Sequence, residues 1–332
     1  MADLGVELGG LELRNPLLSA SGTFGHGLEM QHFAPPELLG GLVSKTVTPR
    51  PRPGNPTPRI CETEAGFLNS IGLENRGIDA YLRDTLPTMA GADTVVITNV
   101  GGESQEDFVR VAERLEDQPA IDAFEVNLSC PNVQGGRLPF ATDPRNAARV
   151  VSGVRAVTEK PIFAKLSPNV SDIAELARAV EGAGADGVTA VNTLLGMSVD
   201  WRRRSPRLAT VQGGYSGPAI KPVALRCAWE CARSVAIPVV GCGGIATAED
   251  VLEFLVAGCT AVQVGTASFS DPSLLARLVG ELGALLDGAG VASAAELIGT
   301  LEDGRRSPAR AQAPRETTSG PSSPSQATAA RN

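Results

Sequence analysis

Short runs of apolar residues recur along the chain, and most of them are continuous rather than alternating with polar residues. Continuous runs of this length are typical of parallel strands that are buried on both faces of a sheet. Eight segments have this character, and we predict a strand in each of them: residues 17–21, 41–46, 94–99, 124–129, 161–166, 187–192, 237–241 and 260–265.

Helical spacing of apolar residues is found between several of these strands. Helices are predicted over residues 103–115, 172–180 and 247–255, and Asp172 and Glu175 have the spacing of a capping box at the start of the second. The alternation of strand and helix over roughly 270 residues predicts an α/β fold, a (β/α)8 TIM barrel, which typically needs about 250 residues. A doubly wound open sheet is the structural alternative.

The two ends of the chain differ from this pattern. Residues 6–13 turn on Gly9-Gly10 and predict an N-terminal β-hairpin, which would close the bottom of the barrel. From Glu302 to Asn332 there is no Leu, Ile, Val, Met or aromatic residue, so this segment buries too little apolar surface to offset its ordering entropy. We therefore expect a barrel domain over residues 1–301 and a disordered Pro/Ser/Thr-rich tail over residues 302–332.

The charge balance excludes several classes of partner. The net charge is −8, and the C-terminal tail carries five arginines against three acidic residues, so the barrel is more acidic still. An acidic surface argues against nucleic acid and against anionic membranes as partners. One basic cluster is formed by Trp201-Arg-Arg-Arg204 and Arg207. We interpret it as a solvated loop, and the alternatives are a docking surface or a substrate lid.

Segments that would direct the chain to a membrane or out of the cell are not evident. No stretch of about 18 apolar residues predicts a membrane span. The N-terminal segment lacks the basic and apolar regions of a secretory signal. The six cysteines are therefore expected to be reduced thiols, and the location is expected to be cytoplasmic.

Polar side chains gather where the predicted strands end, which is the catalytic face of a (β/α)8 barrel. The chain has only two histidines, His26 and His32, so other residues must carry any proton transfer. The predicted rim offers lysines, amides and hydroxyls but no carboxylate, which suits a planar anionic ligand better than a hard metal ion, and we expect no metal. Its members include Ser21, Lys45, Thr46, Asn99, Asn127, Lys165, Asn192 and Thr193.

Glycines follow the last two predicted strands, in Gly241-Cys-Gly-Gly244 and Gly265-Thr266. Backbone N–H groups there, together with the start of the next helix, are expected to bind a phosphate. Gly241-Cys-Gly-Gly-Ile-Ala246 also matches a dinucleotide-binding pattern, but Val262-Gln-Val264 stands where that pattern requires an acidic residue. Binding of NAD to this segment is therefore rejected.

Cys130 differs from the other cysteines because it lies in a polar, glycine-containing loop after the fourth strand. A thiol near lysines can have a lowered pKa and act as a base or a nucleophile. Cys227, Cys231, Cys242 and Cys259 are interpreted as packing residues. No closely spaced cysteine run predicts an iron–sulfur cluster in this chain.

Taken together, these segments resemble dihydroorotate dehydrogenase, the flavin enzyme of pyrimidine synthesis, from about Leu4 to about Ile298. Each motif alone is weak, whereas the full set in this order is specific. The motifs are Ala20-Ser-Gly-Thr-Phe-Gly25, Ser44-Lys-Thr46, Asn69-Ser-Ile-Gly-Leu73, Asn127-Leu-Ser-Cys-Pro-Asn132, Lys165-Leu-Ser-Pro168, Asn192-Thr193, Gly217-Pro-Ala-Ile-Lys-Pro222 and Gly241-Cys-Gly-Gly-Ile245.

The resemblance implies one FMN per chain and a set of site residues. Residues implied to hold FMN are Ser21, Lys45, Thr46, Asn99, Asn127, Lys165, Val191, Gly217, Gly243, Gly244, Gly265 and Thr266. Residues implied to hold dihydroorotate are Lys45, Asn69, Ser70, Ile71, Gly72, Leu73, Asn127, Asn192 and Thr193. Cys130 would be the catalytic base that takes a proton from C5 while C6 gives a hydride to FMN, and Lys165 would stabilise negative charge at the N1/O2 edge of the flavin.

A cysteine at position 130 resembles the soluble class 1 enzymes, and the loop that follows it resembles their NAD-linked 1B subtype. This implies a homodimer core that binds two subunits carrying FAD and a [2Fe–2S] cluster, as a heterotetramer. Ala141, Tyr215 and the arginine-rich stretch depart from the pattern and weaken the subtype assignment. One alternative is a fumarate-linked class 1A homodimer. A second is another FMN barrel, such as a tRNA dihydrouridine synthase, which the acidic charge disfavours. A third is a non-catalytic phosphate-binding scaffold.

Overall fold

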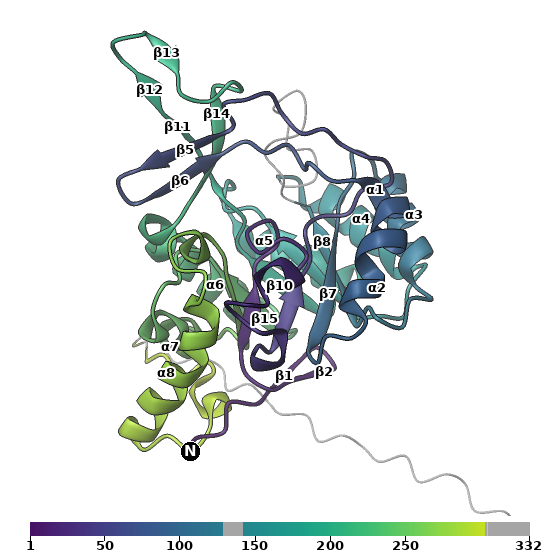
Figure 1. Ribbon diagram of the computed structural model, residues 1–332. Coiled ribbons are helices and arrows are strands. Elements are labelled where there is room, and N and C mark those ends of the chain that lie inside the picture. The colour runs from purple at the N-terminus through teal and green to yellow at the C-terminus, as the bar shows by residue number, and fades with distance from the viewer. Residues whose placement is uncertain (129–141, 303, 305–332) are drawn as a thin grey trace, which may run out of the picture. The chain divides into compact units, whose positions relative to one another are not determined.

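Eight parallel strands close into a barrel in the computed structural model, which describes residues 1–128, 142–302 and 304 (Figure 1). The fold class is therefore the predicted (β/α)8 barrel, not an open sheet. Residue contacts divide the chain into Met1–Leu301, which forms the barrel, and Glu302–Asn332. The predicted tail lies, apart from residues 302 and 304, outside the described residues.

Each of the eight predicted strand segments overlaps one barrel strand. In spatial order around the barrel these are β3 (Leu17–Ser19), β4 (Gly41–Val43), β7 (Val95–Val100), β8 (Ala123–Asn127), β9 (Ile162–Leu166), β10 (Gly187–Ala190), β15 (Val239–Cys242) and β16 (Ala261–Val264). Most of their side chains are buried, because helices cover the outer face and the barrel interior is filled.

Helices surround the barrel and bury one apolar face each against it. They are α1 (Gly77–Ala80), α2 (Leu86–Met89), α3 (Gln105–Leu115), α4 (Pro144–Arg155), α5 (Ile173–Gly182), α6 (Lys221–Ser234), α7 (Ala248–Val256) and α8 (Leu274–Ala289). Single turns lie at Leu28–Met30, Pro36–Leu38, Tyr81–Thr85, Pro218–Ile220, Thr266–Phe269 and Ala294–Leu297. Within the described part of the chain, no helix has both the length and the apolar character needed to cross a membrane.

The N-terminal hairpin of β1 (Val6–Leu8) and β2 (Leu11–Leu13) closes the amino-terminal end of the barrel, as predicted (Figure 1). Val6, Leu8 and Leu13 pack in one cluster with side chains from the starts of the barrel strands. A Cβ on Gly9, whose φ is 58°, would lie 2.9 Å from the carbonyl oxygen of Asp186. The tight Gly-Gly turn is thus required by close packing as well as by its backbone conformation.

Helix capping follows the sequence pattern. Asp172 accepts a hydrogen bond from the N–H of Glu175, at 3.0 Å, at the start of α5. At the start of α7 the Thr247 hydroxyl accepts from the N–H of Asp250 at 3.1 Å, and the Asp250 carboxylate accepts from the N–H of Thr247 at 2.9 Å. This reciprocal pair is a capping box, and it satisfies two N–H groups that a helix start leaves unpaired.

The Thr247→Ala variant should therefore lower the free energy of unfolding by about 1 kcal/mol, measured by urea denaturation. Thr88→Ala is a suitable control, because its exposed hydroxyl bonds only the carbonyl of Thr85 in its own turn. That control should change the free energy of unfolding by less than about 0.5 kcal/mol. Equal effects of the two substitutions would contradict the assigned cap.

An antiparallel extension above the carboxyl ends of the barrel strands was not predicted. It consists of the sheet β11-β14-β6-β5 and the hairpin β12-β13 (Figure 1). Their bounds are β5 (Ile60–Thr63), β6 (Gly66–Asn69), β11 (Leu194–Met197), β12 (Val199–Asp200), β13 (Ser205–Pro206) and β14 (Gln212–Ser216).

The basic cluster found in the sequence lies at the turn between β12 and β13. Trp201 is 71% exposed, and the guanidinium carbon of Arg202 lies 4.5 Å from the centre of its ring. The cluster is therefore a solvent-facing loop, as the first interpretation expected, and its role in docking or closure stays a hypothesis.

Candidate active site

A cavity of about 330 Å3 opens at the carboxyl ends of the barrel strands, beneath the four-stranded sheet. This volume is within the range of small-molecule sites. Its lining includes all of the residues implied to hold FMN except Asn99, and all of those implied to hold dihydroorotate except Ser70. The geometry thus brings together segments that are as far apart in the sequence as Ser21 and Thr266.

Glycines form one end of this cavity. Gly243 and Gly244 have φ values of 131° and 79°, and both line it. A Cβ on Gly244 would lie 2.6 Å from the backbone nitrogen of Lys221, and one on Gly217 would lie 2.7 Å from the Cα of Gly66. These positions exclude side chains, so they leave backbone exposed to a ligand, as a phosphate cradle requires.

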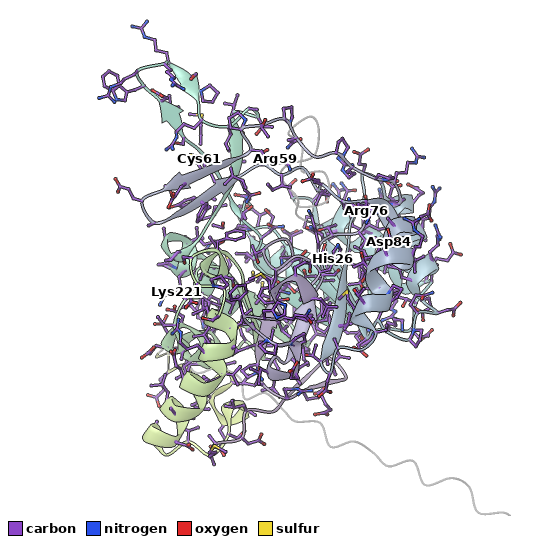
Figure 2. All side chains as sticks on the ribbon, viewed as in Figure 1. His26, Arg59, Cys61, Arg76, Asp84 and Lys221 are labelled. Atoms are coloured by element: carbon purple, nitrogen blue, oxygen red, sulfur yellow. The ribbon has the colours of Figure 1, made fainter. Side chains whose placement is uncertain are left out.

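Two backbone amides between the glycines and α7 have partners within the protein. The Asp250 carboxylate accepts hydrogen bonds from the N–H groups of Ala246 and Thr247 at 2.8 and 2.9 Å. These two amides are therefore already paired and are not available to a ligand at the glycine segment. Lys221, labelled in Figure 2, bridges Asp250 at 2.5 Å and Glu253 at 2.9 Å, which joins the starts of α6 and α7.

Lys165 forms the floor of the cavity and is 5% exposed. Its ammonium donates to the side-chain oxygen of Gln263 at 2.8 Å and to the carboxylate of Glu125 at 3.3 Å. Burial alone lowers the pKa of Lys165, but the charge of Glu125, with smaller contributions from Cys242 and the hydrogen bond to Glu125, raises it above its ordinary value. Lys165 therefore stays a cation at neutral pH.

Glu125 was missed in the sequence reasoning, which found no carboxylate at the rim. It lies on β8, two residues before Asn127, and is fully buried. The available signal was a single acidic residue inside the apolar run of residues 124–129. Asn99 also lies below the cavity rather than in its wall; its amide donates to Glu125 at 2.7 Å, and its own oxygen is buried without a partner among the described residues.

A chain of amides joins the floor to the upper wall. The Asn192 amide donates to the oxygen of Asn127 at 3.3 Å, and the Asn127 amide donates to the hydroxyl of Thr46 at 3.3 Å. The Asn69 amide donates to the carbonyl of Gly214, also at 3.3 Å, within the four-stranded sheet. Ser70 is not part of the cavity lining, and its hydroxyl accepts from the amide of Asn55 at 2.9 Å.

The mouth of the cavity contains residues that sequence reasoning did not identify. Phe67 and Phe269 lie edge to face with ring centres 5.8 Å apart. Glu74 lines the cavity and is paired with Arg59 at 2.5 Å. Figure 2 shows Arg59 and Cys61 at the start of β5, above the barrel. The apolar mouth and the polar floor together suit a flat ligand with a charged end.

The histidines and cysteines divide into those near the cavity and those remote from it. His26 does not line the cavity. Burial lowers the pKa of His26, the charge of Glu29 raises it and the charge of Lys45 lowers it. The net effect is a lowered pKa, so His26 is neutral at pH 7. Burial raises the pKa of Cys242, which lines the cavity, although Lys165 acts in the opposite direction. Cys227, Cys231 and Cys259 are buried in the core, as expected for packing residues. Cys130, the implied base, lies outside the described residues.

Comparisons with known proteins agree on one family. The dihydroorotate dehydrogenase family model matches residues 3–286. The catalytic subunit of dihydroorotate dehydrogenase B (NAD(+)) from Trichlorobacter lovleyi is 50% identical over 299 residues, which cover 90% of this chain and 98% of that protein. The protein of the same name from Geobacter sulfurreducens is 50% identical over 300 residues, with the same coverage.

A solved structure shows the same fold. The crystal structure of DHODH from Eimeria tenella in complex with ferulenol matches with a TM-score of 0.75, over 90% of this chain and 88% of that chain. The sequence identity is 22%, so this likeness concerns the fold alone.

Proposed function

Because the chain belongs to the dihydroorotate dehydrogenase family, we infer that it oxidises (S)-dihydroorotate to orotate in de novo pyrimidine synthesis. The observation that carries this inference is the cavity itself. Residues from most of the barrel strands, which the family resemblance assigns to flavin and to substrate, line a single space. A scaffold that had lost its activity would have no physical reason to keep that polar set together.

FMN fits the donors that line this cavity. Gly243, Gly244 and Gly265 would hold its phosphate, since side chains are excluded at the first two and a Cβ on the third would lie only 3.2 Å from Ala20. Lys45, Thr46 and Asn127 would hold the ring edge from one side and Lys165 from the floor. FMN bound there would supply the acceptor for the hydride that leaves C6 of dihydroorotate.

The remaining residues would bind the substrate and move its proton. Asn69, Asn127 and Asn192 would fix the pyrimidine by amide hydrogen bonds, and Lys45 would bind its carboxylate. Cys130 would take the proton from C5 as a thiolate, so that loss of the proton and the hydride forms the C5=C6 bond of orotate. This role rests on the sequence position of Cys130, three residues after Asn127.

The final electron acceptor is NAD, reached through a second subunit. The relatives that match over most of their length are named as NAD(+)-linked catalytic subunits, which favours the 1B subtype over the fumarate-linked alternative. The partner would carry FAD and a [2Fe–2S] cluster, and two copies would bind a homodimer of this chain as a heterotetramer. The cytoplasmic location stays a prediction.

Purification of the chain with its natural partners, followed by a visible spectrum and a turnover assay, tests these assignments. The isolated chain should be yellow from FMN and should not reduce NAD. The complex should add FAD and iron–sulfur absorbance and should reduce NAD with dihydroorotate as donor. Turnover of the isolated chain with fumarate would instead assign the 1A subtype, and a colourless protein that takes up no added FMN would overturn the flavin site.

A further inference from the structure

Glu125 occupies the centre of the barrel directly behind the cavity floor. Its side chain is 1% exposed, and the cavity lining does not include it. The reaction proposed above gives it no proton to move and no ligand to bind. A carboxylate is nevertheless expensive to bury without a reason, because desolvation penalises its charged form.

Four strands contribute donors to this carboxylate. One oxygen accepts from the Asn99 amide of β7 at 2.7 Å and from the Lys165 ammonium of β9 at 3.3 Å. The other accepts from the Thr189 hydroxyl of β10 at 3.0 Å and from the Gln263 amide of β16. Both oxygens are thus fully paired, and the geometry of each donor depends on the carboxylate between them.

Two of these donors are residues that the family resemblance assigns to FMN. Lys165 directs two of its three N–H bonds to Glu125 and Gln263, which leaves one for the cavity that it lines. Asn99 uses its amide on Glu125, and this orients its unpartnered oxygen. Glu125 therefore determines how Lys165 is presented at the floor and how Asn99 is oriented below it.

We propose that Glu125 is a positioning residue that holds Lys165 in place and offsets its positive charge, so that the flavin meets an ion pair rather than an isolated ammonium. This inference rests on the proposed function of the cavity. A full positive charge beside bound FMN would favour its reduced, more negative form. Glu125 weakens that preference and so keeps the flavin potential low enough to pass electrons onward.

The test is the two-electron midpoint potential of bound FMN in a cycle of four proteins: the parent, Glu125→Gln, Lys165→Met and the double variant. Glu125 and Cys242 are the titratable groups whose charges act on Lys165. The potential is measured at about pH 6, which is far below the ordinary pKa of lysine, so that Lys165 carries its positive charge throughout the titration. Glu125→Gln should favour reduced over oxidised FMN by about tenfold, an upward shift of about 30 mV.

The shift should be smaller in the Lys165→Met background, because only the direct effect of the Glu125 charge on the flavin then remains. Glu125→Asp keeps the carboxylate and should restore a potential closer to that of the parent. An unchanged or lower potential in Glu125→Gln, or an equal shift with and without Lys165, would overturn the proposal. A role in packing alone would alter stability and leave the potential unmoved.

Glu125→Gln leaves Lys165 as an unpaired buried charge, so this variant can fail to fold. The double variant removes both charges and should still fold. Its potential should then lie below that of the parent, because Lys165 is the nearer of the two charges to the cavity. A potential equal to that of the parent would refute the proposal.

If the parent itself binds no FMN, the proposed function fails. That result is distinct from a flavin-loaded parent whose variants show no shift in potential.

Discussion

Cys130→Ala should yield a yellow protein that retains FMN but oxidises dihydroorotate at least about 100-fold more slowly than the parent at neutral pH. Loss of a positioned base removes proton abstraction at C5 and leaves the flavin site of the barrel intact. The measurement is steady-state turnover with dihydroorotate, together with the visible absorbance per mole of protein. Among the described residues, neither His26 nor Cys242 can replace the base, since His26 lies outside the lining and burial keeps Cys242 protonated.

Cys227→Ala provides the matched control for this prediction, because Cys227 is buried on α6 and does not line the cavity. It should retain parental turnover. Cys130→Ser should recover part of the activity, with a rate that rises to higher pH than in the parent, because a hydroxyl loses its proton less readily than a thiol. Near-parental turnover of Cys130→Ala would remove Cys130 from the mechanism.

Gly244→Ala should yield a protein that has lost most of its flavin, with an affinity for FMN reduced by about 100-fold or more. The φ of Gly244 is 79°, and an added Cβ would lie 2.6 and 2.7 Å from the backbone nitrogen and Cα of Lys221. Backbone atoms cannot move aside as a flexible side chain would, so the glycine segment must shift away from the phosphate position. Visible absorbance after purification and titration with added FMN measure the loss.

The same substitution at Gly280 is the control, because this glycine lies within α8 and an added Cβ would meet nothing within 4 Å. Gly280→Ala should keep its flavin and gain up to about 1 kcal/mol of stability. Circular dichroism distinguishes a folded Gly244→Ala barrel without flavin from an unfolded chain. A folded Gly244→Ala protein with parental FMN affinity would show that the cradle lies elsewhere.

The barrel was predictable from the sequence because its signals are local. A strand such as residues 161–166 is recognised from its own continuous apolar run. The same is true of the cap at Asp172 and of the hairpin that turns on Gly9-Gly10. Each of these depends on residues fewer than ten positions apart, and the structure contains all of them.

The antiparallel sheet over the cavity was not predictable in this way. Its strands are short, and β6 pairs with β14 across well over a hundred residues, as in the pairing of Asn69 with Gly214. The half-exposed segments that form it show no distinctive run or alternation. Pairing between distant short segments is a property of the folded chain and leaves little trace in either segment alone.

The sequence by itself determined the fold class, the family and most of the polar set around the cavity, because each follows from residue types at fixed spacing. Only the tertiary structure decided how those groups act on one another. Closure of the barrel brings Glu125, Lys165, Thr189 and Gln263 from four different strands within hydrogen-bond distance. A carboxylate that would be costly alone becomes the partner of a cation because desolvation and charge depend on position in space, not on position in the chain.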